Sequence, residues 1–211
     1  MARTVFVCML LGMLLVEPVG AGTSLPLVEG TDWRQVRAEG QRVFKEMEKL
    51  KFPLPADTVK ALSRLLETEP TDPEAAAAQV QKLLDPHCLA GININPESRV
   101  KAARGALPAE LVRGRETTML IKVHNEGGVT HGLAVSGPQV HTGKNDERER
   151  WLEVKVVGRK LSGSRLEYVL VRLTAHEAGK REATLKFDVG QGTQDLGFRA
   201  EVPILFTIKT P

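Results

Sequence analysis

The chain has 211 residues, of which 42% are hydrophobic and 26% charged, as in ordinary globular proteins. Aromatic residues make up only 4%, so platforms for stacking bases or sugar rings are poorly supplied. The net charge of +3, with the five histidines counted as neutral, is too small to predict nucleic-acid binding without a clustered basic patch. We therefore expect no nucleic-acid partner.

The N-terminal residues have the pattern of a secretory signal peptide. Arg3 precedes an apolar run, Val5–Val16, which is followed by Pro18 and small residues around Ala21. The run is too short to span a bilayer as a helix, which takes about 20 residues. We expect residues 1–21 to be cleaved after Ala21 and the chain to be exported, periplasmic or extracellular, without a transmembrane span. A buried N-terminal helix is the alternative.

Three stretches after this segment have the spacing of amphipathic helices. Their apolar residues recur at intervals of three and four, which lines one face of a helix, in residues 31–51, 56–68 and 71–86. Thr31 or Asp32 is suited to cap the first helix, and Pro86 ends the third. We predict that residues 22–86 form a linker and a small antiparallel unit of three helices.

After Pro86 the apolar period changes to two. Met119, Ile121 and Val123 alternate with polar residues, and the same alternation recurs in residues 151–157, 181–190 and 202–209. Residues 166–175 are apolar on both faces, which suits a central strand. We predict that residues 87–211 form about seven to nine short strands, so that the chain is an α+β protein in which the helical unit precedes an antiparallel, immunoglobulin-like β-sandwich.

His87 and Cys88 lie where the helical part meets the strands. Cys88 would be the only cysteine left after signal cleavage, so we expect no internal disulfide. Adjacent residues of a strand point to opposite faces, so His87 is badly placed to activate the Cys88 thiol. We predict a structural joint with a buried Cys88. A crosslink between two chains through Cys88 is the alternative.

We recognise no complete catalytic constellation, and we expect a protein that is not an enzyme and has no cofactor. His124, His131 and His141 are weak metal-ligand candidates, because their spacing lacks the close pair and distant third ligand of zinc sites. We expect them to be solvated or capping side chains. The alternative is a metal-dependent hydrolase that uses these histidines and nearby acids, or an N-terminal fragment of one.

The loops are the places where a binding site is expected, because binding residues concentrate on loops held by a rigid scaffold. The glycine-rich segment 188–197 lacks the lysine and hydroxyl of a phosphate loop and is interpreted as a tight connection. A calcium ion between Asp188 and Asp195 is the alternative there. The binding-loop candidates are Glu126, Thr130, Gln191 and Asp195. Trp33 and Trp151 are expected to be core residues.

Two stretches resemble the N-terminal module of exported planctomycete-type proteins: INPESRVKAARG…AELVRGRETTMLIKVHNEGGVT (94–130) and AGKREATLKFDVGQGTQDLGFRAEVPILF (178–206). In those proteins a helical and β-sandwich segment precedes a metallohydrolase domain of the PHP (polymerase and histidinol phosphatase) class, similar to the CehA/McbA carbamate hydrolases. This sequence has no His-x-His, so no PHP metal ligand carries over. The resemblance implies a non-catalytic module, free-standing or cut from a longer parent. We expect it to bind an envelope protein or exopolymer.

Overall fold

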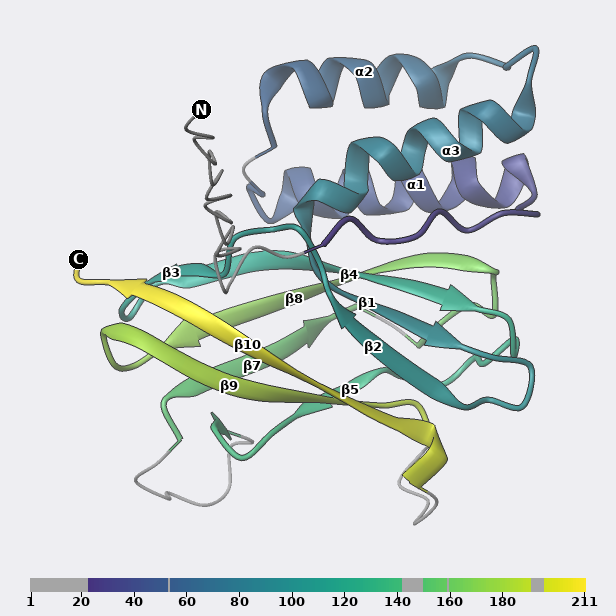
Figure 1. Ribbon diagram of the computed structural model, residues 1–211. Helices are drawn as coiled ribbons and strands as arrows, with labels where there is room; N and C mark the ends of the chain where they lie inside the picture. The colour runs from purple at the N-terminus through teal and green to yellow at the C-terminus, as the bar shows by residue number, and fades with distance from the viewer. Residues whose placement is uncertain (1–22, 53, 142–149, 159, 191–195) are drawn as a thin grey trace, which may run out of the picture.

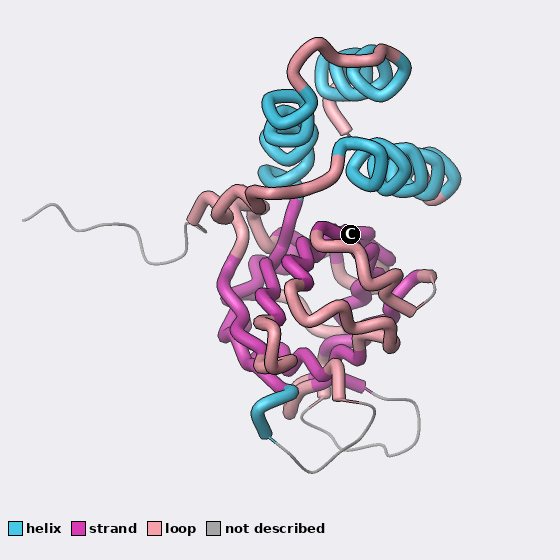
Figure 2. Tube along the Cα trace, turned by 90° about the vertical axis from the view of Figure 1, so that its right-hand side faces the viewer, coloured by secondary structure: helices cyan, strands magenta, loops and turns pink. Residues whose placement is uncertain are grey.

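The computed structural model describes residues 23–52, 54–141, 150–158, 160–190 and 196–211, and these form an α+β structure (Figure 1). The predicted signal segment 1–21 lies outside the described residues. The three expected helices are confirmed, and they lie together on one side of the strands (Figure 2). Their bounds are α1 (Trp33–Lys49), α2 (Ala56–Glu67) and α3 (Pro73–Leu84).

Local signals in the sequence account for where the helices begin and how they pack. The Asp32 side chain accepts a hydrogen bond from the Gln35 amide and caps α1, while Asp72 caps α3 in the same way. Gly40 lies within α1, where a Cβ atom would come 2.7 Å from Leu66 Cδ2. The missing side chain therefore lets α2 pack closely against α1.

The strands form two sheets. The larger has six strands in the order β2-β1-β4-β8-β7-β6 and the smaller has four in the order β3-β10-β9-β5. Their bounds in chain order are β1 (Cys88–Ile94), β2 (Val100–Arg104), β3 (Glu110–Val112), β4 (Glu116–Asn125), β5 (Ala134–Ser136), β6 (Val140–His141), β7 (Leu152–Val157), β8 (Leu166–Ala175), β9 (Gly179–Asp188) and β10 (Arg199–Lys209). Two short 3₁₀ turns, Asp85–His87 and Leu196–Phe198, precede β1 and β10.

The expectation of purely antiparallel sheets is wrong. Both sheets are mixed, because β1 pairs with β4, β3 with β10 and β6 with β7 in parallel. Between β1 and β4 the chain forms β2 and then crosses to the other sheet as β3. When it comes back to the first sheet as β4, it runs alongside β1 in the same direction. Alternation along a strand reports which face is buried and carries no information on which strand lies alongside.

One apolar core fills the space between the two sheets. The predicted inward residues of β4, β9 and β10 lie in it, and so does Trp151, which packs edge-to-face on Phe206 with ring centroids 5.8 Å apart. β8 lies between β4 and β7, as its apolar sequence predicted. The expected strand faces are therefore confirmed.

A second core lies on the outer face of the six-stranded sheet. Leu120 of β4 and three residues of β8, Leu166, Tyr168 and Leu170, pack there against the apolar stripes of the helices, including Trp33. The helices therefore cover a sheet face that the alternation assigned to the outside. In the described part of the chain, no helix combines the length and apolar character needed to cross a membrane.

Phe206→Ala tests the assigned faces of β10. Phe206 is fully buried, and its removal should lower the free energy of unfolding by about 3–5 kcal/mol. Its neighbour Leu205 is 43% exposed on the opposite face, so Leu205→Ala should cost no more than about 0.5 kcal/mol. Urea unfolding of both variants measures the two values, and equal losses would show that the register of β10 is wrong.

Candidate functional site

Residues 23–29, which we call the N-terminal arm, run in an extended path between the helices and the six-stranded sheet (Figure 1). The side-chain amide of Gln81 on α3 holds the arm at Val28. The Val28 N–H donates to Gln81 Oε1 at 2.8 Å, and Gln81 Nε2 donates to the Val28 carbonyl at 3.0 Å. Arg165 Nε donates to the Glu29 carbonyl at 3.0 Å. The arm is thus tied to both the helices and the sheet.

The arm packs against the sheet at Gly91 of β1. A Cβ atom at this position would lie 2.7 Å from Leu25 Cδ2, so only glycine lets Leu25 pack this close to the strand. Leu25 and Val28 are both buried. Burial of these two side chains adds an apolar attachment to the polar anchors at Val28 and Glu29.

A buried ionic network lies beside the arm. Lys122 Nζ donates to Asp85 Oδ2 at 2.7 Å and to the Pro26 carbonyl at 2.8 Å, and the Tyr168 hydroxyl donates to Asp85 Oδ1 at 2.9 Å. Burial raises the pKa of the Asp85 carboxyl, against the lowering effects of Lys122 and Tyr168. Burial and the Asp85 charge raise the Tyr168 pKa well above its usual value, so its hydroxyl stays a donor. The network joins the residue after α3 to the arm, β4 and β8.

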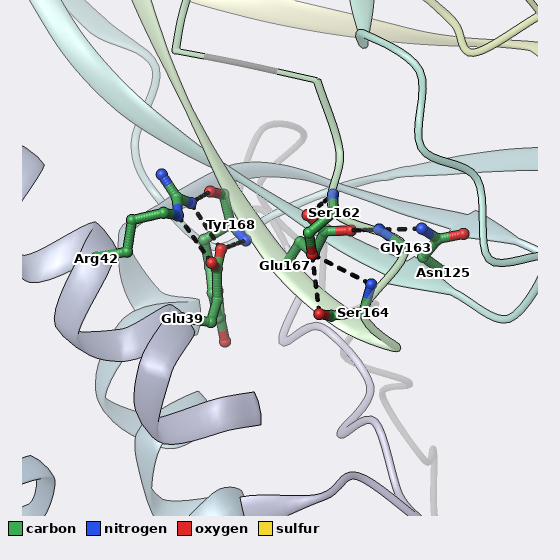
Figure 3. Close-up of polar contacts among 8 residues, drawn as sticks. All are labelled: Glu39, Arg42, Asn125, Ser162, Gly163, Ser164, Glu167 and Tyr168. Atoms are coloured by element: carbon green, nitrogen blue, oxygen red, sulfur yellow. Dashed lines mark hydrogen bonds and ion pairs between the residues drawn. The ribbon is translucent and has the colours of Figure 1, made fainter. Parts of the chain in front are cut away.

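Two side chains of α1 bind the backbone of β8 (Figure 3). Glu39 Oε1 accepts from the Tyr168 N–H at 2.7 Å, and Arg42 Nη2 donates to the Tyr168 carbonyl at 2.6 Å. The last residue of β7 that pairs with β8 is Val157, opposite Leu170, so β7 does not reach Tyr168. Glu39 and Arg42, themselves ion-paired at 2.7 Å, therefore satisfy backbone groups that a longer β7 would have bonded.

The neighbouring residue of β8, Glu167, organises a loop (Figure 3). Its carboxylate accepts from the backbone N–H of Ser162 at 2.6 Å and of Gly163 at 3.1 Å. Asn125 Nδ2 lies 3.4 Å from the same carboxylate and donates to the Val129 carbonyl at 2.8 Å. This buried carboxylate thus holds two loops in place.

The arm and the sheet border a half-open cavity of about 320 Å³, which we call the arm cavity. Its roof is the arm, and its floor is formed by the outer faces of β1, β2 and β4. The lining residues are mostly apolar: Leu25, Pro26, Val28, Gly91, Ile92, Ala102 and Ala103, together with the polar residues Asn93, Lys101, Lys122 and His124. A mostly apolar cavity with a few polar groups is the usual form of a ligand site.

The three candidate histidines lie on different elements. His124 of β4 borders the arm cavity, and its Nδ1 lies 2.9 Å from Asn93 Nδ2. His131 lies in the loop after β4, where its carbonyl accepts from the Leu161 N–H. His141 of β6 packs edge-to-face on His176 with ring centroids 5.6 Å apart. Within the described residues, no three His, Cys, Asp or Glu side chains form a group that could hold a metal ion.

The loop candidates differ in their surroundings. Glu126 Oε1 accepts from Arg165 Nη2 at 3.0 Å, so this carboxylate is part of the attachment of the arm. Thr130 is exposed. Gln191 and Asp195 lie outside the described residues, and with Asp195 so does the alternative calcium site.

Cys88 opens β1, and the turn Asp85–His87 before it joins α3 to the strands, as expected for a joint. The thiol is fully buried, and this burial raises the pKa of Cys88 well above its usual value. The His87 ring packs edge-to-face on Phe52. Burial of His87 lowers its pKa.

The sequence reasoning missed most residues of the arm cavity. The arm has no apolar periodicity, so the sequence predicts only a linker there. Alternation places Lys122 on the polar face of β4, where burial is not expected. One signal did exist: Leu120 lies on the same face as Lys122, and β8 is apolar on both faces, so something has to cover this side of the sheet.

Comparisons with known proteins do not assign the chain to a family. No protein-family model matches it, and no curated protein matches it. The arm cavity is therefore interpreted from its own geometry.

Glu39→Gln tests the contact between α1 and β8. The amide group loses one acceptor and the negative charge, so Arg42 and the Tyr168 N–H lose charge-assisted bonds. We expect a loss of about 1.5–3 kcal/mol in the free energy of unfolding. Glu48→Gln on the exposed side of α1 is the control and should change it by less than about 0.5 kcal/mol. Similar small effects of both changes would contradict the contact.

The Cys88 thiol should be unreactive in the folded protein. With Ellman's reagent at pH 8, the folded chain and its Cys88→Ser variant should release equal amounts of thiolate, because the buried thiol stays protonated. In denaturant the unmodified chain should release one equivalent more. Rapid labelling of Cys88 in the folded chain, or a dimer on a non-reducing gel that Cys88→Ser abolishes, would contradict burial.

Proposed function

We propose that this chain is an exported, non-catalytic binding module of the cell envelope, and that the arm cavity is where it recognises its partner. The observation that carries the proposal is the cavity of about 320 Å³, at the lower end of the range of small ligand sites, roughly 300–1,000 Å³. A cavity of this size accommodates one small group, such as an end group or side chain of an envelope protein or an exopolymer.

The use of the buried polar groups supports a binding role over a catalytic one. Asp85, Lys122 and Tyr168 bond one another, Glu39 and Arg42 bond the β8 backbone, and Glu167 bonds loop amides. Each of these groups fixes one structural element against another. A rigid frame of this kind keeps a cavity open without its ligand, which reduces the ordering cost of binding.

Export and family membership belong to the same proposal. The support for export is the signal-like pattern of residues 1–21. The support for a module related to those before PHP metallohydrolase domains is the resemblance of residues 94–130 and 178–206. We also propose an immunoglobulin-like architecture for the strand region, supported by two sheets that share one core. Its three parallel strand pairs depart from that fold.

Ala103→Trp tests the proposed function. Ala103 is exposed on β2 and lines the arm cavity, so the indole group should fill the cavity without entering the core between the sheets. A tagged chain with its native signal should retain a stoichiometric protein or polysaccharide from cell-envelope extract, and Ala103→Trp should abolish this retention.

Ala134→Trp is the matched control, because Ala134 is exposed on β5 of the other sheet. It should retain the partner fully. Recovery of the bare chain, or equal retention by the Ala103→Trp variant, would contradict the proposed role of the cavity.

A further inference from the structure

The charged and polar groups that line the arm cavity are all bases or hydrogen-bonding groups. Among the described residues that line it are Lys101, Lys122, His124 and Asn93, and none is acidic. A half-open, mostly apolar site lined by these groups favours a ligand whose polar end is an acceptor or an anion.

Lys122 provides a fixed donor at the floor of the cavity. Its ammonium group has three protons, and two are donated, to Asp85 Oδ2 and to the Pro26 carbonyl. The third has no acceptor among the described residues. Because Asp85 balances the charge of Lys122, the net positive charge of the site comes from Lys101, which is exposed on β2.

His124 adds a neutral side chain with a donor. Burial lowers the pKa of His124, so its ring is uncharged near neutral pH. Asn93 Nδ2 donates to His124 Nδ1, which leaves the ring proton on Nε2. His124 Nε2 is buried without a hydrogen bond in the described structure, with Glu126 Oε1 3.6 Å away.

Resting on the proposed function, we infer that the arm cavity binds a compact apolar group that ends in a single carboxylate. Leu25, Pro26, Val28 and Ala103 would surround the apolar part, and the carboxylate would lie near Lys101 and the free proton of Lys122. The volume of about 320 Å³ corresponds to roughly ten water-sized groups of about 30 Å³ each, so a monocarboxylate of about ten non-hydrogen atoms fits.

The test is an NMR titration of the ¹⁵N-labelled protein with octanoate, octanol and octylamine, which share a chain length and differ in charge. Octanoate should shift the amides of Gly91 and residues 101–103 saturably, with a Kd about tenfold below that of octanol. Octylamine should bind most weakly. Binding of octanol or octylamine as tight as that of octanoate would overturn the inference.

Two lysine variants assign the effect to the cavity. Lys101→Met should weaken octanoate binding about tenfold and leave octanol binding unchanged, because only the charge partner is lost. Lys180→Met, at an exposed lysine on β9 of the other sheet, should change neither. Loss of octanoate affinity in both variants, or in neither, would overturn the assignment.

Two further titrations identify the source of the carboxylate. A short peptide that ends in a free Val-Leu carboxylate binds more tightly than octanoate if the source is a protein C-terminus, and less tightly if it is a free acid; either result supports the inference. Its C-terminally amidated form should not bind. If octanoate and the peptide both fail while Ala103→Trp still abolishes capture of a partner, the ligand class is overturned and the proposed function stands.

Discussion

The buried ammonium group of Lys122 is the interaction on which the arrangement of the helices, the arm and the sheet depends. It lies on β4 and bonds Asp85, just after α3, and Pro26 in the arm. Isolated, a buried charge of this kind would cost several kcal/mol, roughly the stability of a small domain. The Pro26 carbonyl and the Asp85 carboxylate, which also accepts from the Tyr168 hydroxyl, offset that cost only when the helices and the arm are docked. Docking and burial of Lys122 are therefore mutually dependent.

Docking of the helices and the arm over Lys122 also explains how the arm cavity forms on the outer face of the sheet. The helices cover β4 and β8, where Leu120 and Tyr168 form an apolar surface, but beyond Cys88 they do not cover β1 or the edge strand β2. The arm crosses this part of the sheet and contacts β1 at Gly91. The space between the arm and β2 is not filled, because Ala103, which faces the arm, has a short side chain. The cavity is thus the space left on this face of the sheet between the helices and the arm.

Periodicity in the sequence predicted the helices and the buried faces of the strands, because apolar spacing directly records which side of an element is covered. It did not predict the parallel neighbours β1 and β4, since alternation carries no information on strand order. It also missed the arm. The partner that holds Val28 is Gln81, 53 positions later, and no local pattern records so distant a bond. Alternation does place Lys122 on the correct face, but it does not predict the burial of Lys122, because the partners come from other parts of the chain.

Hydrogen exchange on a Lys122→Met variant tests whether Lys122 holds the arm and α3 on the sheet. This change removes the charge, leaves Asp85 buried and unpaired, and preserves most of the side-chain volume. The amides of the arm near Val28 and of α3 should lose their protection from exchange together. The amides of β9 and β10, which border the core between the sheets, should stay protected. If the arm and α3 keep their protection in this variant, Lys122 does not hold them on the sheet.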